Sequence, residues 1–473
     1  MYSLTFLAGA AFLLSLLLTP LVRNFSRKWG IVDVPGDHRS VHDRPIPRVG
    51  GIAIAISYLL AYGLLFLVKL KGGIVVWDSI DFALRLLPAA AVIFAIGLID
   101  DIWGLEPWHK LAGEVVAAGL AYWAGVHVQG FGGYILSTMW SLPLTVLWLV
   151  GCTNAINLID GVDGLAAGVG LFATCTALIA ALLQHNINLA FAIVPLVGCL
   201  LGFLRYNFNP ATIFLGDSGS LFIGFLLGCY GVIWSQKAAT ILGMTAPLMA
   251  LSVPLLDTGL AIFRRFLRRQ PIFEGDRGHI HHRLLDRGLT QRKVALILYA
   301  CCAAGATCSV LMMNNNFSGV VVLLFCAMSW IGIQHLGYIE FGVAGRMFIE
   351  GAFRRQLNAQ ISLHAYEDRL QAATTPDEYW KVMEAALKEF GFHRAHMSLS
   401  GLTFDWQDTV YPVSSWEVTV PIADGDFVRL TRPFGSGQPS VVGALADILR
   451  KTLTAKRIIY LNPTREAAVA AGS

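Results

Sequence analysis

The sequence predicts an all-α polytopic membrane protein with about eleven transmembrane helices, followed by a small α+β cytoplasmic domain. Of its 473 residues, 55% are hydrophobic and only 14% are charged, whereas soluble proteins contain about 25% charged residues. Apolar segments of roughly 20 residues, each long enough to cross a bilayer, recur before residue 340. The composition becomes that of a soluble protein from about residue 338, so we expect a membrane domain at 1–340 and an accessory domain at 341–473.

Charged loops between the predicted spans indicate how the chain crosses the membrane. The spans are expected at about residues 3–22, 50–69, 83–99, 107–127, 140–158, 163–184, 188–204, 219–235, 240–263, 294–313 and 318–337. Lys and Arg are concentrated in the loops after the first and ninth spans, and cytoplasmic loops are the ones enriched in these residues. Loops on the other side are nearly free of them, apart from Lys69, Lys71 and Lys237. We therefore expect the N-terminus outside and the C-terminus in the cytoplasm.

The accessory domain combines helical and strand patterns. Thr375-Pro-Asp-Glu378 is a capping box with proline at the first helical position, and apolar residues then follow at helical spacing up to Gly391. We expect strands near 396–402, 416–422 and 426–430, a helix near 440–456, and an amphipathic linker helix at 346–371. The order of elements is similar to that of GAF sensor domains, but no ligand motif accompanies it.

The polar stretch from Asn154 to Gly164 interrupts two long apolar runs. Asn157, Asp160 and Asp163 are spaced three residues apart, so in a helix they would project to roughly one side. An ordinary polar loop with an aspartate helix cap would give the same pattern. The predicted orientation brings this stretch to the cytoplasmic face together with four other polar clusters, at 33–50, 100–101, 205–220 and 274–292. Five clusters on one membrane face are what a single active site requires.

Three further aspartates extend this acidic group. Asp100 and Asp101 end the third span, where adjacent carboxylates beside an apolar medium both stay ionised only next to a cation. A solvated helix end is the alternative interpretation. Asp217 opens the eighth span close to Asn209 in sequence, at a helix N-terminus that would also favour phosphate. Such oxygen ligands suit Mg²⁺, which binds through one or two carboxylates plus substrate phosphates.

A basic segment at 275–285 contains His279, His281, His282 and Arg283. Zinc ligation is one interpretation, although no cysteine or fourth ligand accompanies the histidines. Contact of a surface loop with lipid headgroups is a second. We favour anion recognition, in which Arg277 and Arg283 pair with phosphate and the imidazoles donate hydrogen bonds. Magnesium and basic groups around phosphates together predict phosphoryl transfer.

These motifs resemble those of the bacterial polyprenyl-phosphate N-acetylhexosamine-1-phosphate transferases, relatives of the phospho-N-acetylmuramoyl-pentapeptide translocase. They occur in the family's order over about residues 1–340, as Pro45-Ile-Pro-Arg48-Val-Gly-Gly51, Asp100-Asp101, Lys110, Asn154–Leu165, Phe214-Leu-Gly-Asp217-Ser-Gly219, Pro254-Leu-Leu-Asp257-Thr258 and His279-Ile-His281-His282-Arg283. The resemblance implies transfer of a sugar-1-phosphate from a UDP-N-acetylhexosamine to undecaprenyl phosphate in the bacterial inner membrane, with release of UMP.

The resemblance also implies residue roles. Asp217 would ligate Mg²⁺, or Mn²⁺ in its place, with Asp101 nearby, and Asp100 would position or deprotonate the lipid phosphate. Asn157, Asp160 and Asp163 would hold the nucleotide and the metal-bound phosphate, and Lys110 would contact phosphate. The candidates for catalysis are Asp100, Asp101, Asp160, Asp163 and Asp217. The candidates for substrate binding are Arg48, Lys110, Asn154, Asn157, Asn209, His279, His281, His282 and Arg283, of which the last four would contact the diphosphate and sugar.

The histidine pattern of the family implies a simple donor sugar, with N-acetylglucosamine preferred, and a product that begins a surface polysaccharide such as O-antigen of lipopolysaccharide. Direct attack by the lipid phosphate is preferred to a covalent intermediate. A net charge of +4 is too weak to indicate nucleic acid as a partner, and a homodimer stays open. The alternative function is a transporter of a phosphorylated or nucleotide-linked solute, which predicts repeated halves and charges at the membrane midplane. Only Asp257 fits that description. An intramembrane aspartyl protease would need a glycine where Phe214 stands.

Overall fold

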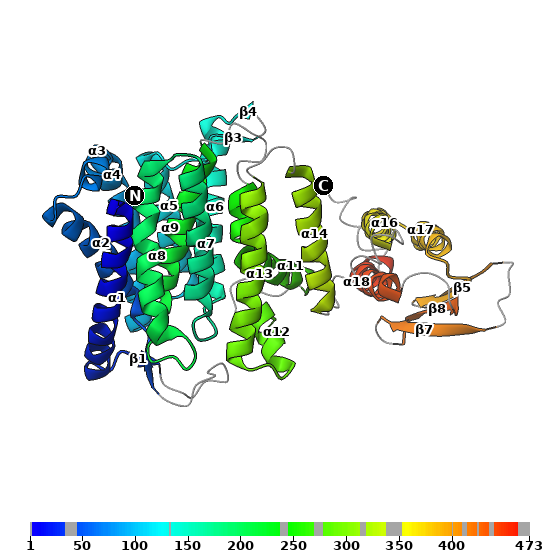
Figure 1. Ribbon diagram of the computed structural model, residues 1–473. Helices are drawn as coiled ribbons and strands as arrows, with labels where there is room; N and C mark the ends of the chain where they lie inside the picture. The colour runs from blue at the N-terminus through cyan, green and yellow to red at the C-terminus, as the bar shows by residue number, and fades with distance from the viewer. Residues whose placement is uncertain are drawn as a thin grey trace, which may run out of the picture. The chain divides into compact units, whose positions relative to one another are not determined.

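The computed structural model describes residues 2–33, 45–131, 134–236, 245–268, 278–312, 318–336, 352–399, 401–408, 414–422, 425–434 and 439–461. The chain divides into two compact units, Met1–Tyr338 and Ile339–Ser473. The first unit is helical and the second combines helices with a sheet (Figure 1).

The first unit is a bundle of helices joined mostly by short loops. Its helices are α1 (Tyr2–Lys28), α2 (Gly50–Leu67), α3 (Gly72–Asp78), α4 (Ile80–Trp103), α5 (Pro107–Ala124), α6 (Thr138–Leu158), α7 (Leu165–Leu183), α8 (Ile187–Asn207), α9 (Gly216–Gln236), α10 (Thr245–Ala250), α11 (Ser252–Arg268), α12 (Ile280–Asp286), α13 (Gln291–Leu311) and α14 (Ser318–His335). Two antiparallel pairs of short strands accompany them, β1 (Val32–Asp33) with β2 (Ile46–Pro47) and β3 (Gly130–Phe131) with β4 (Tyr134–Ile135).

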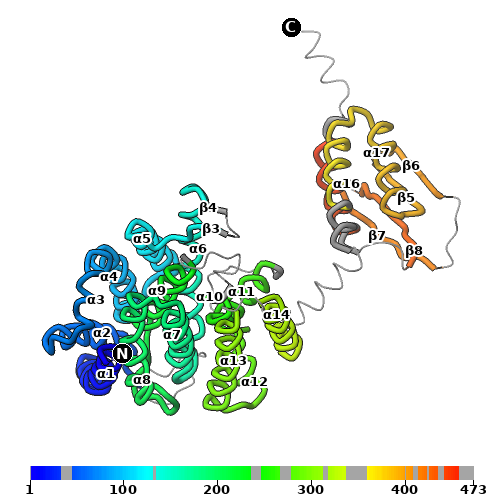
Figure 2. Tube along the Cα trace, turned by 45° about the horizontal axis from the view of Figure 1, so that its top comes forward, coloured from blue at the N-terminus to red at the C-terminus, as the bar shows by residue number. Residues whose placement is uncertain are grey.

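Helix α9 is the most buried of the long helices, and it packs against α2, α4, α6 and α7 (Figure 2). Small residues allow this close packing, as at other helix contacts in membranes. A Cβ atom built on Gly97 of α4 would lie 2.5 Å from the carbonyl oxygen of Asp217. Close contact at Gly97 therefore brings the end of α4, with its two aspartates, against the beginning of α9.

Nine helices within the described residues are long and apolar enough to cross a membrane, namely α1, α2, α4, α6, α7, α8, α9, α13 and α14. The predicted helical, multi-pass character is thus confirmed, whereas the count of eleven spans and their orientation stay predictions. The span expected at 107–127 is α5, which carries two charged residues and is not among the nine. The span expected at 240–263 is divided into α10 and α11. Pro254 contributes to this break because it has no N–H group to donate to Ala250.

The second unit is a small α+β structure. It contains α16 (Ala352–Ala372), α17 (Pro376–Glu389), β5 (Arg394–Leu399), β6 (Leu402–Gln407), β7 (Ser415–Pro421), β8 (Phe427–Pro433) and α18 (Pro439–Leu461). The strands form an antiparallel sheet in the order β6-β5-β8-β7, and the helices cover one of its faces (Figure 1). The predicted cap is present, since Thr375 Oγ1 accepts a hydrogen bond from the N–H of Glu378 at 3.3 Å. Residues 346–351 of the predicted linker helix lie outside the described residues.

Candidate functional site

A cavity of ≈ 290 Å³ opens between helix ends in the first unit. Its walls include the end of α4, the loop between α6 and α7, and the beginning of α9. The lining residues are Asp33, Arg48, Asp100, Asp101, Asp160, Gly161, Val162, Asp163, Asn207, Phe214, Gly216, Asp217 and Gln291. All five polar clusters that the sequence predicted on one membrane face therefore contribute to a single cavity.

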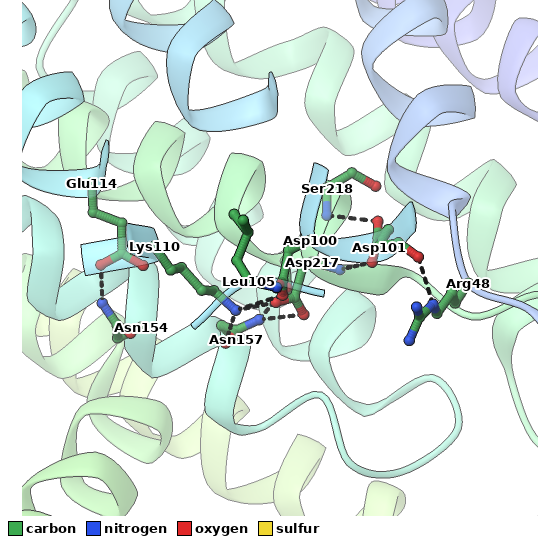
Figure 3. Close-up of polar contacts among 11 residues, drawn as sticks. Arg48, Asp100, Asp101, Leu105, Lys110, Glu114, Asn154, Asn157, Asp217 and Ser218 are labelled. Carbon is green, nitrogen blue, oxygen red and sulfur yellow. Dashed lines mark hydrogen bonds and ion pairs between the residues drawn. The ribbon is translucent and has the colours of Figure 1, made fainter. Parts of the chain in front are cut away.

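Lys110 of α5 is the centre of a polar network beside this cavity (Figure 3). Its Nζ forms an ion pair with Asp217 Oδ2 of α9 and lies 3.3 Å from Asp100 Oδ2 of α4. The same Nζ donates a hydrogen bond to Asn157 Oδ1 of α6 at 3.3 Å. Oxygen atoms from three helices thus converge on one positive charge.

Asn157 and Leu105 fix the orientation of the two carboxylates in this network. Asn157 Nδ2 donates hydrogen bonds to Asp217 Oδ1 and to Ser220 Oγ, both at 2.9 Å. The backbone N–H of Leu105 donates to Asp100 Oδ1 at 2.6 Å. Each of the two aspartates is therefore held through one carboxylate oxygen, and its other oxygen faces the ammonium group of Lys110.

Asp101 caps the N-terminus of α9 from the neighbouring helix. Its Oδ1 accepts a hydrogen bond from the N–H of Asp217 at 2.7 Å, and its Oδ2 accepts one from the N–H of Ser218 at 3.0 Å. The Nε of Arg48 donates to the Asp101 carbonyl at 2.7 Å. The first helical residue, Gly216, has a positive φ of 71°, which favours glycine. Asp101 therefore holds the beginning of α9, and with it Asp217, in place. Its place beside a metal, which the resemblance implies, stays a prediction.

The loop between α6 and α7 contributes two further aspartates. Asp163 Oδ2 accepts hydrogen bonds from Asn209 Nδ2 at 3.0 Å and from the N–H of Ala211 at 2.9 Å, so it holds the loop before α9. Asp160 lines the cavity. Burial raises the pKa of Asp160 well above its usual range, and repulsion from Asp217 adds to the effect. A cation in the cavity would allow Asp160 to ionise.

Asp257, which the sequence left without a role, holds the helix that carries the histidines. Its Oδ2 lies 3.1 Å from His279 Nδ1, and its Oδ1 accepts a hydrogen bond from the N–H of Ile280 at 2.8 Å. Both side chains are buried. Asp257 therefore caps α12 across a gap of more than twenty residues, much as Asp101 caps α9.

His281 lies against the loop between α6 and α7, at Gly161, which lines the cavity. Its ring stacks on that of His279, with ring centres 5.8 Å apart, and a Cβ atom built on Gly161 would lie 2.5 Å from His281 Nε2. Burial lowers the pKa of His281 to about 3, and repulsion from His282 contributes. His281 is therefore a neutral imidazole at physiological pH, able to donate one hydrogen bond without adding positive charge.

Comparison with known proteins agrees with this site. The chain matches the model of glycosyl transferase family 4 over residues 83–235. It is 37% identical, over 298 residues, to the probable undecaprenyl-phosphate N-acetylglucosaminyl 1-phosphate transferase of Bacillus subtilis (strain 168), covering 61% of this chain and 80% of that protein. The chain belongs to glycosyl transferase family 4. The resemblance seen in its motifs is thereby confirmed.

Two other relatives show a similar relationship. The decaprenyl-phosphate N-acetylglucosaminephosphotransferase of Mycobacterium tuberculosis (strain ATCC 25618 / H37Rv) is 37% identical over 308 residues, or 59% of this chain and 74% of that protein. The undecaprenyl-phosphate alpha-N-acetylglucosaminyl 1-phosphate transferase of Thermotoga maritima is 31% identical over 290 residues, or 60% of this chain and 83% of that protein. The family 4 match runs from α4 to α9 and so contains the Lys110 network, whereas α12 lies beyond it.

Some predicted substrate-binding residues lie elsewhere. Arg283 Nη1 donates a hydrogen bond to the carbonyl of Leu336, just after α14, at 3.3 Å. Asn154 Nδ2 is bonded to Glu114 Oε2 and to the Val150 carbonyl. Neither residue lines the cavity. Arg277 lies outside the described residues.

Glu114 is the residue of this network that sequence reasoning missed. It is 2% exposed and lies one helical turn after Lys110. An acidic residue within the apolar run that follows Lys110 was the available signal, because ionisable residues at membrane depth are functional candidates.

Proposed function

We propose that this protein is a Mg²⁺-dependent transferase that moves an N-acetylhexosamine-1-phosphate, preferably N-acetylglucosamine-1-phosphate, from a UDP-sugar to undecaprenyl phosphate and releases UMP. The names of its relatives supply the polyprenyl phosphate and the N-acetylglucosamine phosphate. The observation that carries the proposal is the convergence of Asp100, Asn157 and Asp217 on one cation beside an acidic cavity.

The oxygen atoms around Lys110 Nζ fit a magnesium ion. Asp217 and Asp100 each present a carboxylate oxygen, and Asn157 presents an amide oxygen, all of which are hard ligands of the kind that Mg²⁺ prefers. Among the described residues, no three His, Cys, Asp or Glu side chains form a metal site by themselves. This agrees with Mg²⁺ sites that use one or two carboxylates and complete their shell with water and substrate phosphates. When bound, Mg²⁺ would neutralise charge on the diphosphate.

The chain's own residues would position the two substrates. An oxygen of undecaprenyl phosphate attacks the β-phosphorus of the UDP-sugar, a new P–O bond forms, and the bond from that phosphorus to the bridging oxygen breaks. UMP leaves with the bridging oxygen, and the lipid keeps the sugar through a diphosphate. Lys110 balances the negative charge of Asp100 and Asp217, and neutral His281 donates a hydrogen bond without repelling the metal. Asp101 keeps Asp217 in place through α9.

Purified protein in detergent tests the proposal directly. We expect radiolabelled UDP-N-acetylglucosamine, undecaprenyl phosphate and Mg²⁺ to give labelled lipid and an equal amount of UMP. The variant Asp217→Asn, which keeps the side-chain shape but removes the charge, should give neither product. Absence of labelled lipid with every UDP-N-acetylhexosamine tested would overturn the proposal.

We also propose a cellular setting for the reaction. The protein would lie in a bacterial inner membrane with its N-terminus in the periplasm and its C-terminus in the cytoplasm, because the basic loops favour that orientation. Its product would begin a surface polysaccharide such as O-antigen. Single cysteines introduced at the two ends of α9 would test the orientation, since only the end at Gly216 should be protected from a reagent that cannot cross the membrane.

A further inference from the structure

Glu114 presents a buried carboxylate oxygen that the proposed reaction does not use. Its Oε2 accepts a hydrogen bond from Asn154 Nδ2, whereas its Oε1 has no hydrogen-bond partner among the described residues. Only 2% of the residue is exposed. A buried polar atom without a partner costs free energy, so an oxygen of this kind calls for a role.

We propose that Lys110 occupies the cation position in the metal-free protein, and that Glu114 receives its ammonium group when a divalent cation binds to Asp217. The inference rests on the proposed function, because it requires a metal ion at Asp217.

Lys110 and a metal ion would compete for the same oxygen atoms. The ammonium group contacts Asp217 Oδ2, Asp100 Oδ2 and Asn157 Oδ1, which are the oxygens offered to the metal. Two positive charges a few ångströms apart in a partly buried site repel each other strongly. Binding of a divalent cation therefore requires the ammonium group to move away from Asp217.

Glu114 is in the right place to receive the displaced ammonium group. Residues four apart lie on the same side of a helix, so Glu114 is the neighbour of Lys110 one turn along α5. Figure 3 shows the Lys110 side chain extending away from Glu114 toward the carboxylates. The lysine side chain is a flexible four-carbon stem, so it can turn back along the helix. In that position it would pair with Glu114 Oε1, and Asn154 would hold the carboxylate through Oε2.

The residue that precedes this helix, at its N-cap, provides a matched control. Glu106 lies four residues before Lys110, at the same spacing as Glu114 in the opposite direction. Its side chain is 78% exposed, so solvent screens its charge. If the ammonium group moves inward, Glu114 should affect metal binding and Glu106 should not.

Binding of Mn²⁺ to the full-length protein in detergent, measured by electron paramagnetic resonance without substrate, tests the inference. Lys110→Met should bind Mn²⁺ about tenfold more tightly than the wild type, and Glu114→Gln about tenfold more weakly, a size typical of coupled neighbouring residues. Glu106→Gln should bind like the wild type. In the Lys110→Met background, Glu114→Gln should have no effect, because no ammonium group then needs a partner.

Several results would overturn the inference. These are Lys110→Met binding no more tightly than wild type, an equal effect of Glu106→Gln and Glu114→Gln, or an undiminished effect of Glu114→Gln without Lys110. Lys110→Gln provides a second test if Lys110→Met does not fold. Failure of every variant to bind Mn²⁺ would also overturn it. The transferase proposal is judged separately, by release of UMP, so the two failures can be distinguished.

Discussion

Replacing Asp101 by asparagine should separate the positioning of α9 from metal ligation. Asparagine keeps one acceptor oxygen and the shape of the side chain, but its amide NH₂ would face a backbone N–H group of α9. The native carboxylate accepts two such hydrogen bonds, from Asp217 and Ser218, at 2.7 and 3.0 Å. Hydrogen bonds to a charged group contribute about 1.5–3 kcal/mol each. Loss of one should therefore cost about 2 kcal/mol of unfolding free energy.

Thermal unfolding and Mn²⁺ binding of the purified variants measure the two effects separately. A loss of about 2 kcal/mol corresponds to a fall in unfolding temperature of about 3 °C for a unit as long as Met1–Tyr338. We expect this fall for Asp101→Asn, together with Mn²⁺ binding that is weakened but present. Asp217→Asn should abolish Mn²⁺ binding because it removes the proposed metal ligand, whereas the backbone N–H that Asp101 caps is kept.

The opposite pattern would show that Asp101 does not act by positioning α9. If Asp101→Asn unfolded at the wild-type temperature and bound no Mn²⁺, Asp101 would be a metal ligand and its contacts with α9 would be incidental. Asp101→Glu provides a control, since it keeps the charge but moves the carboxylate by one methylene group. It should be less stable than the wild type because the carboxylate no longer matches the two N–H groups.

Three further predictions concern His281, Gly161 and the second unit. The pKa of His281 lies near 3 in the folded protein, below its unfolded value of about 6.5. The contribution of His281 to the unfolding free energy should therefore be fully present above pH 6.5 and fall by about 1.4 kcal/mol per pH unit below it. Unfolding of His281→Gln, measured against pH, should lack this part of the slope, and an unchanged slope would contradict the assignment. Gly161→Ala would push a methyl group against His281 Nε2, so the rate of UMP release should fall about tenfold or more. Gly119→Ala is the control and should be fully active, because no atom lies within 4 Å of its new Cβ. Deletion of 350–473 should leave the transferase reaction intact if that unit is regulatory, and loss of activity by a still-folded membrane unit would count against this.

Much of the fold and of the site could be predicted because membrane insertion restricts what a sequence can do. Long apolar runs can only be helices when they cross lipid, so the positions of α1 to α9 were predicted closely except for the short α3. The same restriction makes polar residues at helix ends informative. Asp100, Asp160 and Asp217 were therefore recognised as parts of one site, although they are separated by up to 117 residues in sequence (from 100 to 217).

Individual contacts could not be predicted, because they depend on how helices face one another. Asp101 and Asp100 are adjacent in sequence, yet one caps α9 and the other faces Lys110. Periodicity did not separate them, since two neighbouring residues on a helix point in directions about 100° apart and either could face the cavity. Glu114 was missed for a related reason: its hydrogen-bond partner Asn154 lies on a different helix, α6.

The histidine segment shows a third limit of sequence reasoning. Its basic residues predicted anion recognition as a group, but the structure separates them. His281 contacts the α6–α7 loop, whereas Arg283 donates to the carbonyl of Leu336 near the end of α14. Asp257 orients His279 from α11. Apolar content alone could not show that α11 is separate from α10.

In the proposed reaction, the β-phosphoryl group of a UDP-sugar moves to a lipid phosphate with its sugar attached. UDP-N-acetylglucosamine labelled with ³²P at either the α- or the β-phosphate tests this most directly, with undecaprenyl phosphate as acceptor and separation of lipid from water-soluble products. We expect the β-label to enter the lipid completely and the α-label to stay entirely in UMP. Recovery of the α-label in the lipid, or release of UDP in place of UMP, would contradict it.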